Sequence, residues 1–120
     1  MANAKAAWLT QTPLVPTGGS LDEAVAFYTN QLGFVVEWRG GNMAGICRDQ
    51  VRFNLVENST QAWLDNSSIS IGVTNLDAIW AEYKDVPVRM TPPEMKFWGR
   101  REMHMIVPSG VCLQFYELAG

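Results

Sequence analysis

Two stretches of the chain, ICRDQVRFN at residues 46–54 and IVPSGVCLQ at residues 106–114, match each other at a shift of 60 residues. Each contains two short β-forming runs around a polar turn, Asp49-Gln50 in the first and Pro108-Ser109-Gly110 in the second, and therefore predicts a β-hairpin. Two hairpins with the same internal spacing indicate a duplicated unit.

A helix is predicted ahead of each hairpin. Ser20-Leu21-Asp22-Glu23 has the form of a capping box, and apolar residues then recur at helical spacing up to Leu32 and the terminating Gly33. The second helix follows Asn75, a good N-cap, and carries Leu76, Ile79, Trp80 and Tyr83 on one face. Leu21-Asp22 with Tyr28 matches Leu76-Asp77 with Tyr83 at a shift of 55, so the helices repeat as well.

The order of the remaining elements is the same in both halves. The expected strands are Trp8–Val15, Phe34–Arg39, Ala44–Arg48 and Val51–Glu57, then Ser67–Thr74, Val86–Met90, Glu102–Val107 and Val111–Glu117. We therefore expect an α+β fold in which residues 1–120 form a single domain of two βαβββ repeats, at about 7–57 and 67–117. The strands are expected to form a curved, cup-like mixed sheet with the helices on its outer face.

Composition excludes several classes of protein. The 120 residues are 48% apolar without any apolar run near the ~20 residues that cross a bilayer, and no secretory signal is recognisable. A net charge of −3 argues against a nucleic-acid partner. Two cysteines 65 residues apart suggest neither a disulfide scaffold nor a zinc knuckle. We expect a cytoplasmic protein without a membrane or nucleic-acid partner.

The alternation of side chains divides the last strand of each half into two faces. Val51, Phe53 and Leu55, like Val111, Leu113 and Phe115, are expected to pack on the helices. The opposite face carries Arg52, Asn54, Val56, Cys112, Gln114 and Tyr116. This face is either solvated or the wall of a cavity, and the aromatic pair Phe97-Trp98 nearby favours a cavity.

Three motifs resemble one known family. AVAFYTNQLGF at 24–34, MAGICRD at 43–49, and WGR at 98–100 with PSG at 108–110 look like the bleomycin-resistance branch of the vicinal oxygen chelate superfamily, the relatives of glyoxalase. The likeness runs from Pro13 to Glu117, although its first motif is common to the whole superfamily. It implies a homodimer, often with an exchanged N-terminal strand, that binds drug in grooves between the subunits.

The same resemblance identifies the positions at which metal-dependent relatives hold their ion. They fall near Gln11 and at Asn54, Ser68 and Gln114, where neutral amides and a hydroxyl are poor ligands for zinc, nickel or iron. We expect no metal and no other cofactor. His104, the sole histidine, lies opposite Gln114 if Val107 pairs with Val111; a hydrogen-bonded structural role is expected rather than catalysis.

Two functions are compatible with these observations. The first is a non-catalytic protein that sequesters a bleomycin-like or other cationic, heteroaromatic compound and so confers antibiotic resistance. The second is a metal-dependent glyoxalase- or dioxygenase-type enzyme of the same superfamily. We favour the first and expect no catalytic residue. Trp80 and Trp8 are expected in the core, and Trp63 is left unassigned. The expected ligand-binding residues are Trp38, Met43, Arg52, Asn54, Ser68, Ser70, Phe97, Trp98, His104, Gln114 and Tyr116.

Overall fold

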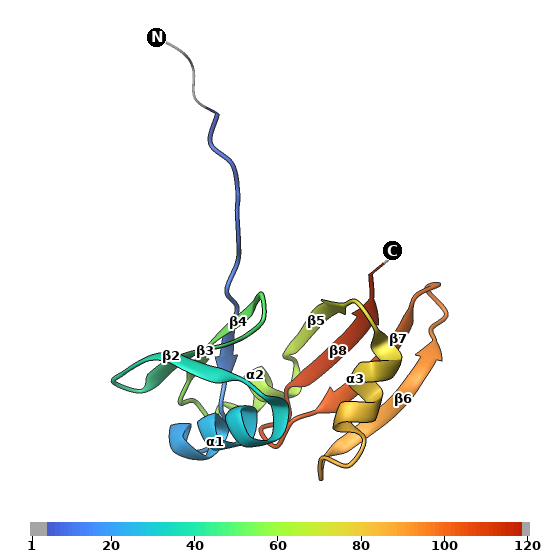
Figure 1. Cartoon of the computed structure of the whole chain (residues 1–120). Coiled ribbons are helices and arrows are strands. Elements are labelled where there is room, and N and C mark those ends of the chain that lie inside the picture. The colour runs from blue at the N-terminus through green and yellow to red at the C-terminus, as the bar shows by residue number, and fades with distance from the viewer. Residues whose placement is uncertain (1–4, 119–120) are drawn as a thin grey trace.

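The first half of the chain forms a four-stranded mixed sheet covered by one helix (Figure 1). The computed structural model describes residues 5–118. Strand β1 pairs in parallel with β4, which is followed across the sheet by β3 and β2 in antiparallel pairing. The elements are β1 (Leu14–Pro16), α1 (Leu21–Leu32), β2 (Val35–Gly40), β3 (Met43–Arg48) and β4 (Val51–Val56).

The second half repeats this arrangement after a short helix, α2 (Gln61–Asp65), which the sequence did not indicate. The order β5-β8-β7-β6 corresponds to β1-β4-β3-β2, with β5 parallel to β8. The α+β class with βαβββ units is therefore confirmed. No helix within residues 5–118 is long and apolar enough to cross a bilayer. The elements are β5 (Ser68–Val73), α3 (Leu76–Tyr83), β6 (Arg89–Met95), β7 (Arg101–Ile106) and β8 (Cys112–Glu117).

The core lies between the sheets and the helices, as the alternation predicted. Phe53, Leu55 and Leu113 are fully buried, and they pack in one cluster with Leu32 of α1 and Leu76 of α3. The other face of both sheets is free of helices and only partly shielded from solvent. It is this second face that presents the predicted site residues.

Each long helix is held at its start by a cap residue and by a glutamate at or just after the end of the last strand of its own half. The Ser20 hydroxyl accepts from the backbone N–H of Glu23, as the motif predicted, while Glu57 Oε1 accepts from Leu21 N at 2.8 Å. In the second half, Glu117 Oε1 accepts from Leu76 N at 3.0 Å. A carboxylate at this end also interacts favourably with the helix dipole.

The N-terminal segment differs from the prediction. Strand β1 spans only Leu14–Pro16, and residues 5–12 extend away from the body of the molecule (Figure 1). The β1 residues pair with 54–56 of β4, and the Pro13 carbonyl accepts from Asn54 N at 2.9 Å, whereas residues 5–12 pair with no strand within the described chain. Trp8 is 102% exposed, so its expected place in the core is wrong.

The sixth strand also lies further along the chain than expected. It begins at Arg89 rather than Val86 and runs through Pro92 and Pro93, with a register shift between Thr91 and Glu94. Prolines are tolerated there because β6 is an edge strand and needs no N–H on its outer side. Val86, placed in a strand by its apolar character, packs on the core from a turn instead.

Candidate ligand-binding site

The helix-free face of the first sheet is largely apolar and carries an aromatic platform. Trp38 of β2 lies beside Gly45 of β3, which in turn pairs with Asn54 of β4. The indole covers Gly45 so closely that a side chain at this glycine would overlap it. The glycine therefore lets Trp38 lie on the sheet, with part of its ring open to solvent.

The charge on this face is locally balanced. Arg52 Nε lies 3.1 Å from Glu37 Oε1, and both side chains are partly exposed. Glu37 lies at the register shift between Val36 and Trp38. An exposed pair of this kind contributes little to stability, and it leaves the face without a strong net charge.

The helix-free face of the second sheet carries a row of hydrogen-bonding groups. Pairing across the strands places Thr91, His104, Gln114 and Ser70 side by side on β6, β7, β8 and β5. The predicted pairing of His104 with Gln114 is confirmed. Ser70 Oγ donates to Gln114 Oε1 at 3.4 Å, and the backbone N–H of His104 donates to the Thr91 hydroxyl at 3.2 Å.

Beside this row lies a buried carboxylate that the sequence analysis missed. Glu102 of β7 is 0% exposed. Its Oε2 accepts from Trp98 Nε1 at 2.8 Å and Arg100 Nε at 2.6 Å, and its Oε1 lies 2.8 Å from His104 Nε2. The Arg100 guanidinium lies over the Tyr116 ring, 3.8 Å from its centroid. We call Trp98, Arg100, Glu102, His104 and Tyr116 the Glu102 cluster.

The hydrogen bonds decide the charge of this carboxyl group. Burial alone would raise the pKa of Glu102, because it disfavours the charged form. The hydrogen bonds from His104, Trp98 and Arg100, with the positive charge of Arg100, outweigh burial and lower the pKa to about 2. Glu102 is therefore ionised at neutral pH, and its charge is balanced by Arg100.

The predicted site residues fall on two faces rather than one. Ser68, Ser70, Trp98, His104, Gln114 and Tyr116 belong to the second half, whereas Trp38, Met43, Arg52 and Asn54 belong to the first. Phe97 is 96% exposed at the tip of the β6–β7 hairpin, edge-to-face with Trp98 at 4.7 Å. Alternation from His104 could have placed Glu102 on the same face, but its burial and its partners depend on how the hairpin folds over.

The residues at the metal-ligand positions of the superfamily do not fit a divalent metal. Asn54 and Gln114 lie on different sheets, Ser68 begins β5, and Gln11 is exposed ahead of β1. All four are neutral oxygen or amide donors, which bind zinc, nickel or iron poorly. Within residues 5–118, no three His, Cys, Asp or Glu side chains are grouped so as to hold an ion.

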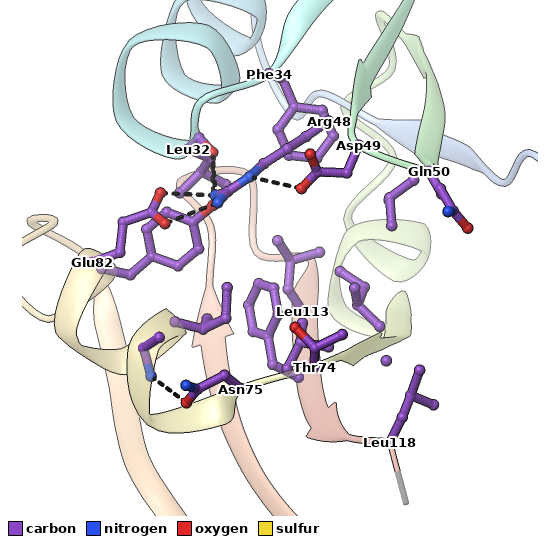
Figure 2. A pocket seen from close by; sticks show the side chains of 18 residues that line it. Leu32, Phe34, Arg48, Asp49, Gln50, Thr74, Asn75, Glu82, Leu113 and Leu118 are labelled. Carbon is purple, nitrogen blue, oxygen red and sulfur yellow. Dashed lines mark hydrogen bonds and ion pairs between the residues drawn. The ribbon is translucent and has the colours of Figure 1, made fainter. Parts of the chain in front are cut away.

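A cavity lies elsewhere, between the two halves of the chain (Figure 2). This cavity of about 560 Å³ has apolar walls, including Phe34, Ile71 and Leu113, and none of the predicted site residues lines it. Arg48 at its edge donates to the Leu32 carbonyl at 3.0 Å, to Glu82 at 2.8 Å and to the Tyr83 hydroxyl. These contacts join β3 and α1 of the first half to α3 of the second.

Comparison with solved structures shows what this arrangement resembles. A bleomycin-binding protein complexed with bleomycin superposes with a TM-score of 0.84 at 20% identity, covering 93% of this chain and 100% of that one. The bleomycin-binding protein of Streptomyces verticillus, complexed with copper(II)-bleomycin, gives a TM-score of 0.84 at 26% identity, with coverage of 96% and 100%. The chain has the fold of the bleomycin-binding proteins.

Sequence comparison points to the same branch. Bleomycin resistance proteins from Geobacillus stearothermophilus and Staphylococcus aureus are 22% identical over 128 residues, which cover 91% of this chain and 96% of each relative. No protein-family model matches the chain. A glyoxalase/bleomycin resistance/dioxygenase superfamily member from Sphaerobacter thermophilus superposes less well, with a TM-score of 0.67 at 21% identity and coverage of 92% and 98%. The resemblance to the bleomycin-resistance branch is confirmed.

Proposed function

We propose that this protein binds a bleomycin-like compound without altering it chemically, and protects a cell by sequestering the drug. The observation that carries this proposal is the likeness in both sequence and fold to bleomycin resistance and bleomycin-binding proteins, over more than 90% of the chain. The helix-free faces support it with aromatic and hydrogen-bonding groups. Within residues 5–118, no three His, Cys, Asp or Glu side chains are grouped so as to hold a metal ion beside them.

The chemistry of these faces suits a flat heteroaromatic ligand with a positive charge. Trp38 and Trp98 present partly exposed rings, and each stacked ring is worth about 1–3 kcal/mol. Gln114, Ser70 and His104 supply neutral donors and acceptors beside them. The net charge of −3 favours a cationic ligand over an anionic one.

We further propose that the protein is a homodimer and that the ligand lies in a groove between the subunits. In one chain the two sets of predicted residues lie on separate sheets, both with a helix-free face. The N-terminal segment carries Trp8 and Leu9, 102% and 89% exposed, on extended backbone. Exchange of this segment with a second copy would remove both side chains from water. We expect this dimer to work in the cytoplasm.

Titration with metal-free bleomycin tests the proposal. Calorimetry and tryptophan fluorescence are expected to show saturable binding, and mass spectrometry should recover the drug unchanged after prolonged incubation. Expression in a sensitive bacterium should raise the inhibitory concentration of the drug. Chemical conversion of the drug would support the enzyme reading instead. The absence of heat, quenching and protection together would contradict the proposal.

A further inference from the structure

Glu102 occupies a place where a charge is costly. A fully buried carboxylate destabilises a fold unless it is paired and hydrogen-bonded. Here three side chains from different positions donate to or contact its two oxygens: Trp98, Arg100 and His104, at 2.6 to 2.8 Å. An apolar residue would fill the same space without these demands. The carboxylate therefore does something that packing does not need: it fixes three polar side chains of the helix-free face at once.

The Arg100 side chain has two contacts within the chain, and the rest of its guanidinium group is exposed to solvent. Its Nε donates to Glu102, and its planar head rests on the Tyr116 ring at 3.8 Å. Among the described residues 5–118, no hydrogen bond is made by its Nη1 and Nη2 atoms, and the side chain is 39% exposed. A guanidinium in this state presents a rigid pair of parallel N–H donors, which matches the oxygens of a planar carbonyl or carboxyl group.

His104 is oriented by the same carboxylate. An ionised carboxylate only accepts hydrogen bonds, so the Nε2 atom that faces Glu102 Oε1 must carry the proton. In the neutral ring Nδ1 is then the acceptor, in the manner of a carboxylate that sets the tautomer of a ligand-binding histidine. The cluster thus offers a donor pair from Arg100 and one acceptor from His104.

We infer that Glu102 is the positioning residue of this face, and that the fork it holds on Arg100 binds a planar carboxamide or carboxylate group of the ligand. The inference rests on the proposed function for the identity of the ligand, and on the geometry of the Glu102 cluster for the group recognised. A carboxylate accepts from the two N–H groups of the fork with two oxygens, whereas a neutral carboxamide accepts with its single carbonyl oxygen and keeps its NH2 group free to donate.

Binding experiments with matched arginine variants test the fork. Arg100→Lys keeps the charge but loses the planar pair of donors, and bleomycin binding is expected to weaken at least tenfold. Arg101→Lys is the control, because Arg101 is the next residue, is equally exposed at 39%, and pairs with Asp77 of α3 at 2.8 Å. The affinity of Arg101→Lys for bleomycin should stay within twofold of that of the wild type. If Arg100→Lys binds bleomycin with wild-type affinity, the proposal that the N–H pair of Arg100 binds the ligand is wrong.

The sole histidine provides a direct readout of positioning that does not depend on bleomycin. Nitrogen-15 NMR of the His104 ring should show the Nε2-protonated form in the wild type. Glu102→Gln is expected to shift the ring toward the other tautomer, and Glu102→Asp to retain the wild-type form. An unchanged ring in folded Glu102→Gln would overturn the positioning role. If that variant does not fold, the wild-type ring decides: an Nε2-protonated ring supports the role, and an Nδ1-protonated ring contradicts it.

A pair of small probes separates this inference from the proposed function. Benzamide and sodium benzoate share a planar carbonyl group, and each should shift the Trp98 indole N–H resonance in the wild type but not in Arg100→Lys. If the probes bind but bleomycin does not, the proposed function is wrong, and the proposed binding role of Arg100 is supported. If neither probe shifts the resonance, the proposed binding role of Arg100 is wrong, whether or not bleomycin binds. A response to benzoate alone identifies the carboxylate as the group recognised.

Discussion

At the scale of single residues, the side chains on the helix-free faces differ in what holds them. Trp38 rests on Gly45 by contact alone, whereas Trp98 is fixed by a hydrogen bond to a buried carboxylate. The sequence identified both tryptophans as candidates from their type and place. It could not identify Glu102, because a glutamate in an exposed strand and one buried under a hairpin look the same in a periodic pattern. Burial of this residue depends on Trp98 and Arg100 folding back over it.

Truncation of Trp98 is expected to weaken the ligand complex, and it also removes one hydrogen bond from the buried Glu102 carboxylate. Trp98→Ala removes one stacking ring worth about 1–3 kcal/mol, which corresponds to about 5- to 150-fold in affinity for bleomycin. Trp80→Ala is the contrast: Trp80 packs against the core from α3, so its loss should lower the free energy of unfolding by up to about 3 kcal/mol. Calorimetric titration and urea unfolding measure the two effects. Equal affinities for Trp98→Ala and wild type would refute a stacking role.

Glu102 also predicts how stability depends on pH. Its folded-state pKa of about 2 lies below the ordinary value of about 4.3 for a glutamate in an unfolded chain. The unfolded state therefore binds the proton first, and the stabilisation from Glu102 is complete above about pH 5. It is lost as the pH falls toward 2. Urea unfolding between pH 5 and pH 2 should show a shallower loss in Glu102→Gln than in the wild type; parallel curves would contradict the assignment.

At the scale of elements, local motifs predicted the two long helices α1 and α3 well, but they missed the short helix α2 and placed the edge strands β1 and β6 poorly. The start of α1 follows from Ser20 and its end from Gly33, whose φ of 81° a residue with a side chain rarely adopts. These signals act within a few residues of each other. The bounds of β1 and β6 depend instead on which strand lies alongside, and no local pattern near Trp8 or Val86 records that. Both errors occurred at strands with a neighbour on one side only.

The two capping glutamates should contribute similar amounts to stability. Glu57 and Glu117 come from equivalent strand ends and accept from the first backbone N–H of α1 and of α3. Replacement of either by alanine leaves a helix N–H without its partner and should cost about 1 kcal/mol in the free energy of unfolding. Glu23→Ala is the control, since this exposed residue lies in the first turn of α1 but makes its cap contact through the backbone. A cost for Glu23→Ala equal to that for Glu57→Ala would argue that general charge, not the hydrogen bond, is responsible.

At the scale of the whole molecule, the single chain leaves two surfaces exposed that a second copy could cover. The helix-free faces bear the predicted ligand contacts, and the N-terminal segment holds two large apolar side chains in water. The repeat in the sequence predicted the two units, and the order of strands agrees with it. How two copies fit together is not recorded in any pattern within one chain, because it depends on the shapes of surfaces formed only after folding.

The N-terminal segment therefore provides the last test. If it is exchanged between subunits, Trp8→Ala and Leu9→Ala together remove the apolar anchors and should raise the dimer dissociation constant at least tenfold. Burying two such side chains is worth about 3–6 kcal/mol at most, of which association and ordering of the segment consume a part. Sedimentation equilibrium measures the change, and Lys5→Ala is the control, because Lys5 lies on the same segment but has a charged end that stays in water. A wild-type protein that sediments at the mass of one 13.4 kDa chain at micromolar concentration would refute the dimer. If the double substitution leaves the dimer dissociation constant unchanged, pairing through the helix-free faces would remain possible, but exchange of the N-terminal segment would be excluded.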